Sequence, residues 1–136
     1  MVDYKSQLLY LGKSYQNMVL LVGDLQDGSL VSEFENFFPA RVMHFGQGER
    51  NMLAAAAGFC LAGKLPVVLG EDLLEKGLQQ VVSVLVAPRL NVRLLDFGGR
   101  VDGEQFGLKV AKDLESFVGS FEEYGVVCLR AGLGLC

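Results

Sequence analysis

This chain of 136 residues has one histidine and three cysteines, too few and too scattered for a standard metal site or a disulfide framework. Cys60, Cys128 and Cys136 lie far apart and form no C-x-x-C pair. A structural zinc site takes four such ligands at short spacings, and a disulfide framework needs an even number of cysteines. The sequence therefore predicts no metal site, and it indicates reduced, structural thiols.

Three further absences narrow the class of protein. No apolar run approaches 18 residues and the N-terminus lacks a signal-peptide pattern, so we expect a soluble, cytoplasmic protein with no membrane partner. The net charge is −4 and lysines and arginines form no cluster, which argues against nucleic acid as a partner. The sequence also lacks the G-K-[ST] element of a P-loop.

The chain is instead rich in apolar residues and glycine. Hydrophobic residues make up 51% of it and 17 residues are glycine, a composition typical of a globular protein with many tight turns. At this length we expect one domain, residues 1–136. Short apolar runs alternate with helical patterns, which predicts an α/β fold: a mainly parallel sheet of five to six strands in a three-layer α/β/α arrangement.

The boundaries of the elements follow from the same patterns. Continuous apolar runs predict strands at 18–22, 41–45, 65–69, 92–97 and 126–129. Helices are predicted at 3–15, 28–37, 48–63, 71–86 and 104–117, the last from Phe106, Val110 and Leu114 at a spacing of four. Residues 131–136 are predicted as a short stub or a sixth edge element.

Polar side chains gather where the first three strands end. In an open α/β sheet, ligands bind outside the carboxyl ends of the strands. The candidates at these ends are Asp24, Ser29, His44, Gln47, Glu49 and Glu71.

Each of the stronger candidates also has a purely structural interpretation. Glu49 would stabilise the first turn of its helix through the helix dipole, an effect of about 0.3–1 kcal/mol. Asp24 and Asp27 are typical turn and capping residues, and Ser29 would cap the helix that follows it. His44 is the only histidine, and a lone histidine at a strand end is usually satisfied structure.

Gly46 and Gly48 begin like the glycine fingerprint of dinucleotide-binding proteins. The third glycine position, however, holds Asn51. A lone G-x-G is a weak signal, and here the fingerprint fails.

The segment around these glycines carries a family likeness. Arg41-Val-Met-His-Phe-Gly-Gln-Gly-Glu49-Arg-Asn-Met-Leu-Ala-Ala-Ala-Ala-Gly58 resembles R-F-x-D-x-G-I-A-E-Q-N-M-x-x-x-A-x-G of the pyrimidine-binding domain in the transketolase family. Asp24-Leu25 with Gly28-Ser29 is similar to that family's D-L-x-x-S loop. Residues 61–68 and 79–92 resemble its L-A-G-x-x-P-F-V and D-Q-I-R…N-x-x-V segments, so the likeness covers about residues 18–129.

The resemblance implies a specific cofactor. Transketolase-family enzymes use thiamine diphosphate (ThDP), a stabiliser of carbanions, bound between a pyrimidine domain and a diphosphate domain. Glu49 matches the glutamate that hydrogen-bonds the aminopyrimidine ring and activates the cofactor, so it is the implied catalytic residue. Asp24 matches an acidic position near the thiazolium ring, and Gln47 and Gly48 would face the cofactor. The Mg²⁺ and diphosphate ligands belong to the other domain.

The sequence departs from the family pattern in four respects. Gln47 stands where the family has an isoleucine beneath the bent cofactor. Residues 69–73 replace the S-T-F-A-x-F loop, whose aromatic ring stacks on the pyrimidine. Residues 97–103 replace a longer loop that contains histidines, and the family's C-terminal domain has no counterpart in the sequence.

The resemblance therefore leads to two main hypotheses. The first is a pyrimidine-domain subunit of a split ThDP enzyme that transfers two-carbon ketol units or acts on a 2-oxo acid. Such a subunit would form a homodimer or a heteromer with a diphosphate-domain subunit, which would supply Mg²⁺. The second is a non-catalytic interaction or regulatory protein that has lost cofactor binding. A sensor that binds a small molecule at the same strand ends is a third, weaker hypothesis.

Overall fold

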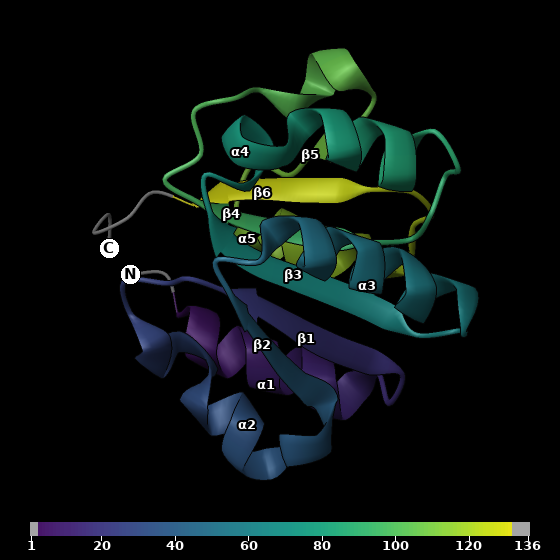
Figure 1. Cartoon of the computed structure of the whole chain (residues 1–136). Coiled ribbons are helices and arrows are strands. Elements are labelled where there is room, and N and C mark those ends of the chain that lie inside the picture. The colour runs from purple at the N-terminus through teal and green to yellow at the C-terminus, as the bar shows by residue number, and fades with distance from the viewer. Residues whose placement is uncertain (1–2, 132–136) are drawn as a thin grey trace.

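The computed structural model describes residues 3–131 and contains one six-stranded sheet (Figure 1). The strands are β1 (Met18–Gly23), β2 (Val42–Gly46), β3 (Leu65–Glu71), β4 (Arg93–Phe97), β5 (Lys109–Val110) and β6 (Val127–Ala131). They lie in the order β2-β1-β3-β4-β6-β5, and every neighbouring pair is parallel. The predicted α/β fold with a parallel sheet is confirmed.

Helices cover both faces of this sheet and complete the three predicted layers (Figure 1). The first face carries α1 (Tyr4–Ser14), α2 (Ser32–Phe37) and α5 (Leu114–Gly119), and the second carries α3 (Glu49–Leu61) and α4 (Leu73–Gln80). Because successive side chains of a strand point to opposite faces, β1 contributes to both cores. Met18, Leu20 and Val22 pack on the first face, and Val19 and Leu21 on the second.

Short helical segments join these elements. Four 3-10 turns are formed by Gly28–Val31, Pro39–Arg41, Gly103–Phe106 and Ser120–Glu122, and a π-helical segment, Val81–Val86, continues α4. The predicted helix at 71–86 is thus present, although its second half is wound more loosely.

The predicted helix at 104–117 is wrong. Gly107 has a left-handed φ of +92°, which ends the first 3-10 turn, and β5 then pairs with β6. A new helix, α5, begins only after Asp113, whose carboxylate accepts a hydrogen bond from the Ser116 N–H at 2.8 Å. The sixth strand is therefore β5. Of the predicted element at 131–136, Ala131 belongs to β6, and 132–136 lie outside the described residues.

The strand order places a switch point between β1 and β3. The chain leaves β1 for α2 on the first face and leaves β3 for α4 on the second, although the two strands are neighbours. In doubly wound sheets, ligands usually bind outside the carboxyl edge at such a switch point. In residues 3–131 no helix combines the length and the apolar character that crossing a membrane requires.

Candidate functional site

The loops that follow β1, β2 and β3 carry the predicted site residues. They lie side by side at the carboxyl edge, because β2, β1 and β3 are consecutive in the sheet. Gly23 at the end of β1 lies opposite Gly46 at the end of β2, and Val22 lies opposite Leu69 of β3. The sheet therefore brings the Asp24, Gln47–Glu49 and Glu71 segments to the same edge, beside the switch point.

Glu49 is the first residue of α3 and is half-buried. A tight turn precedes it: Gly46 has a left-handed φ of +56°, and the Gly48 N–H donates to the Phe45 carbonyl at 2.9 Å. Behind it, Met52 and Leu53 are completely buried against the sheet. No group within residues 3–131 forms a hydrogen bond or ion pair with the Glu49 carboxylate, which leaves it available to a ligand.

Two of the other three predicted cofactor contacts are more open to solvent. Asp24 and Gln47 are exposed, and Gly48 is half-buried. Asp24 follows β1 directly, and Gln47 and Gly48 form the turn that leads into α3. The structure thus brings all four predicted residues to one edge, although it gives only Glu49 and Gly48 partial burial.

Two other candidates have structural roles. Asp27 caps the 3-10 turn after β1: its Oδ1 accepts from the Ser29 N–H at 3.0 Å and from the Ser29 hydroxyl at 2.5 Å. These bonds hold the pKa of Asp27 below its usual range. His44 is exposed, and its Nε2 lies 2.9 Å from Glu35 Oε1 on α2. The capping interpretation of Asp27 is confirmed, and His44 has a protein partner. The prediction that Ser29 caps the following helix is wrong, because the N-cap of α2 is Val31, which makes no side-chain hydrogen bond.

Glu71, at the end of β3, forms a hydrogen bond to the loop that follows β1. Its Oε2 accepts a hydrogen bond from the Gln26 N–H at 2.5 Å, across 45 residues of sequence. Asp72 follows it with a left-handed φ of 54°, which is uncommon for a residue other than glycine.

A buried carboxylate on the neighbouring strand supports this loop. Asp96 of β4 is completely buried, and its Oδ1 accepts from the Leu73 N–H at 2.7 Å at the start of α4. Burial raises the pKa of Asp96, the hydrogen bonds from Leu73 and Leu74 lower it, and the net shift is upward. Sequence patterns missed this residue, because it stands inside an apolar run that predicts only a strand.

A second feature of the carboxyl edge is basic. A hollow of about 630 Å³ lies beyond the ends of β4, β5 and β6, with Gly98, Gly99 and Ala131 in its wall. It carries two exposed cations, Lys112 and Arg130. Arg130 directly follows the last predicted strand, 126–129, and belongs to β6. The sequence does not place it near Lys112, because only the pairing of β5 with β6 brings the two residues together.

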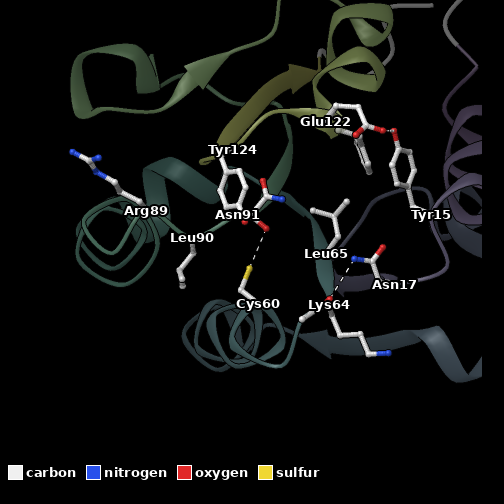
Figure 2. Close-up of a pocket in the computed structure, with 12 residues that line it drawn as sticks. Tyr15, Asn17, Cys60, Lys64, Leu65, Arg89, Leu90, Asn91, Glu122 and Tyr124 are labelled. Carbon is white, nitrogen blue, oxygen red and sulfur yellow. Dashed lines mark hydrogen bonds between the residues drawn. The ribbon is translucent and has the colours of Figure 1, made fainter.

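The amino edge of the sheet holds a different pocket, of about 400 Å³ (Figure 2). Figure 2 shows two hydrogen bonds in this pocket. The Cys60 thiol donates to the Asn91 backbone carbonyl at 3.0 Å, and the Tyr15 hydroxyl donates to Glu122 Oε1 at 2.8 Å. None of the predicted site residues lines it. Burial raises the pKa of the Cys60 thiol, and raises that of Cys128 to about 12.

These two cysteines are free thiols, as the sequence indicated, and their raised pKa values leave them protonated and unreactive at neutral pH. Cys136 lies outside the described residues.

Comparisons with known proteins identify relatives of the chain. No protein-family model matches it. A Methanocaldococcus jannaschii protein, provisionally named transketolase C-terminal section, is 34% identical over 94 residues, which are 68% of this chain and 30% of that protein. The 1-deoxy-D-xylulose-5-phosphate synthase of Corynebacterium glutamicum (strain R) is 32% identical over 65 residues, 48% of this chain and 10% of the enzyme. The chain thus spans less than a third of the length of either relative.

Two solved structures share the fold. The structure titled split gene transketolase, inactive beta4 tetramer, superposes with a TM-score of 0.76 at 23% identity, over 96% of this chain and 50% of that one. A provisionally described thiamin diphosphate-dependent enzyme from Mycobacterium smegmatis has a TM-score of 0.69 at 13% identity, over 97% of this chain and 31% of its own.

The sheet order and the strand-end site define an open, parallel α/β domain of the kind found in these two structures. Within that class, the sequence relatives are named for transketolase and for 1-deoxy-D-xylulose-5-phosphate synthase. The predicted resemblance to the transketolase family is confirmed, and the chain is a transketolase-like domain.

Proposed function

We propose that this chain is the pyrimidine-domain subunit of a split transketolase-type ThDP enzyme, formed by a single domain over residues 1–136. The observation that carries the proposal is Glu49: a half-buried carboxylate without a protein partner in the described part of the chain, at the start of a packed helix beside the switch point. The names of two similar proteins, a transketolase C-terminal section and a split gene transketolase, support a subunit rather than a whole enzyme.

In this proposal Glu49 holds a proton at the aminopyrimidine ring of the cofactor. Within residues 3–131 the carboxylate makes no hydrogen bond that a ligand would have to replace. The packed first turn of α3 fixes the backbone that carries it, and a fixed position is what preorganised electrostatic catalysis requires. When bound, ThDP supplies the carbanion-stabilising chemistry.

Asp24, Gln47 and Gly48 are proposed to line the same cofactor site. Gln47 and Gly48 place the backbone of the turn before α3 at the switch point. Asp24 provides a second carboxylate from the loop after β1. No group of three histidine, cysteine, aspartate or glutamate side chains in residues 3–131 is arranged to hold a metal ion. We therefore assign the Mg²⁺ and diphosphate ligands to the partner subunit.

The proposed reaction class is suggested by the names of the relatives, a transketolase section and a 1-deoxy-D-xylulose-5-phosphate synthase. The partner and this subunit together would transfer a two-carbon ketol unit or act on a 2-oxo acid. The two cations at the basic hollow, Lys112 and Arg130, suit the anionic end of such a substrate.

One observation favours the alternative, a relative that has lost cofactor binding. The loop after β3 carries Glu71 instead of an aromatic residue, and the Glu71 carboxylate is bonded to the Gln26 N–H rather than left open. In that case the chain would keep the fold and serve as an interaction or regulatory protein.

Reconstitution tests the proposal. The purified chain is mixed with a diphosphate-domain chain of the same organism, one that carries a G-D-G…N magnesium motif, and ThDP binding is measured by calorimetry with Mg²⁺ present. We expect no measurable binding to the isolated chain, because it lacks the diphosphate ligands and carries a net charge of −4. We expect binding to the mixture that exceeds binding to the partner alone. Micromolar binding to the isolated chain, or no effect of adding it, would contradict the proposal.

A further inference from the structure

The hydrogen bond between Glu71 and Gln26 joins the two loops at the switch point between β1 and β3. Glu71 ends β3 and Gln26 lies three residues beyond the end of β1, and these two strands send their helices to opposite faces of the sheet. The bond therefore joins two loops that otherwise diverge, over the place where a doubly wound sheet usually binds its ligand.

The Glu71 end of this bond is firmly anchored. Glu71 lies opposite Phe97 in the β3–β4 register, and the next N–H, that of Asp72, donates to the Phe97 carbonyl at 3.0 Å. The first N–H of α4, from Leu73, is bound by the buried Asp96. The backbone on both sides of Glu71 is thus fixed to β4.

The other end is not anchored in this way. Within the described residues, the remaining hydrogen bonds of segment 24–27 are local and link Asp27 to Ser29 and Leu30. Leu25 packs against the edge of the core and is only partly buried. The Glu71 bond is therefore the hydrogen bond that ties segment 24–27 to another element of the fold.

We propose that Glu71 is a positioning residue, which holds segment 24–27 and with it Asp24 in place at the switch point before any ligand binds. This inference deepens the proposed function, in which Asp24 contacts the cofactor. A loop that is already ordered costs less to bind, since its conformational freedom need not be lost at that step. The loop after β3 would then serve the site through Asp24 rather than by stacking on a ring.

The test uses the isolated ¹⁵N-labelled chain and three variants: Glu71→Ala, Glu71→Gln and, as a matched control, Glu75→Ala. Glu75 is an exposed glutamate four residues further on, in the first turn of α4. The rate at which the Gln26 amide exchanges its proton with water is measured by NMR, together with the melting temperature.

Glu71→Ala should speed the exchange of the Gln26 amide by about ten- to a hundredfold, the scale of a lost hydrogen bond to a charged group. Glu71→Gln keeps an acceptor oxygen and should give a smaller increase, and Glu75→Ala should give none. The amide signals of residues 24–27 should shift in Glu71→Ala while the melting temperature stays close to that of the unchanged chain.

Equal exchange rates in Glu71→Ala and the unchanged chain would overturn the inference, as would an equal increase in Glu75→Ala. A large drop in melting temperature with shifts throughout the sheet would also overturn it, since Glu71 would then support the fold rather than one loop. These readouts need no cofactor or partner, so a chain that fails to bind ThDP with its partner still decides this question.

Discussion

At the scale of single residues, burial separates the charged side chains that hold the fold from those left for a ligand. Arg93 of β4 is completely buried and donates hydrogen bonds of 2.6 Å to the carbonyls of Ser120 and Glu123 and of 2.8 Å to that of Gly125. Desolvation lowers its pKa to about 10, so it remains a cation at neutral pH. Glu49, in contrast, is half-buried and has no such partner within the described residues.

Asp96 should give stability a measurable dependence on pH. Its pKa in the folded protein is raised above the ordinary value of 3.8, chiefly by burial. The contribution of this group is therefore fully present below the unfolded pKa and is lost as the pH rises through the folded pKa. We expect the free energy of unfolding of the unchanged chain, relative to Asp96→Asn, to fall as the pH rises from 3 to 7.

Urea denaturation of both proteins across this range measures that difference. The subtraction removes the opposite contribution of Asp3, Asp27 and Asp113, whose pKa values are lowered by hydrogen bonds to serines. A difference that is constant or rises with pH would contradict the assignment.

The sequence was informative about the candidate site residues at the strand ends and uninformative about the buried charged residues. Glu49 and Asp24 stand out because each follows a glycine at the end of an apolar run. Arg93 and Asp96 lie within such a run, and the groups that satisfy them come from segments 27 and 23 residues away. Only the packed fold brings these partners together.

At the scale of elements, the region 104–117 shows why a periodic pattern can mislead. Phe106, Val110 and Leu114 have helical spacing, yet they belong to a 3-10 turn, to β5 and to α5. Gly107 adopts a conformation that helices exclude, and pairing with β6 favours an extended backbone at Lys109–Val110. Tertiary pairing therefore overrides the local pattern here, whereas the other predicted elements have no such competitor.

Gly107 should be intolerant of a side chain. Alanine at φ +92° is strained, and its Cβ would lie 3.0 Å from Val86 Cγ1. We expect Gly107→Ala to lower the free energy of unfolding by roughly 1–2 kcal/mol, the usual cost of a left-handed residue. The matched control is Gly119→Ala at the end of α5, where a Cβ meets nothing within 4 Å. Thermal or urea denaturation that shows equal effects for the two variants would refute this account of the turn.

At the scale of the whole molecule, one face of α3 remains uncovered. Met52, Leu53 and Ala56 pack against the sheet, whereas Ala54, Gly58 and Leu61 are exposed. Leu61 is 80% exposed and stands at the end of this face. Small side chains also allow another backbone to approach closely.

We therefore predict that the chain forms a homodimer or larger assembly, or a heteromer with the diphosphate-domain subunit, which buries this face of α3. Light scattering at micromolar concentration should give a mass above that of one chain, and Leu61→Lys should reduce it. A chain that stays monomeric at that concentration both when it is alone and when the partner subunit is present would contradict this prediction.

The fold as a whole was predictable because its sheet is buried on both faces. Strands of that kind read as continuous apolar runs, and their alternation with helices fixes a parallel α/β arrangement. The function is less accessible, because in the proposed function this chain would hold only part of a cofactor site. The residues that would complete that site would belong to the proposed partner subunit.

The most direct test of the account is Glu49→Gln in the reconstituted complex, with Glu75→Gln as the matched first-turn control. If Glu49 activates the cofactor, its replacement should lower kcat by roughly 10²-fold or more. The free energy of unfolding should change by no more than about 1 kcal/mol, the value of a first-turn carboxylate. Turnover that survives Glu49→Gln unchanged while the melting temperature falls would show that Glu49 is structural, and the chain would then be a non-catalytic member of its family.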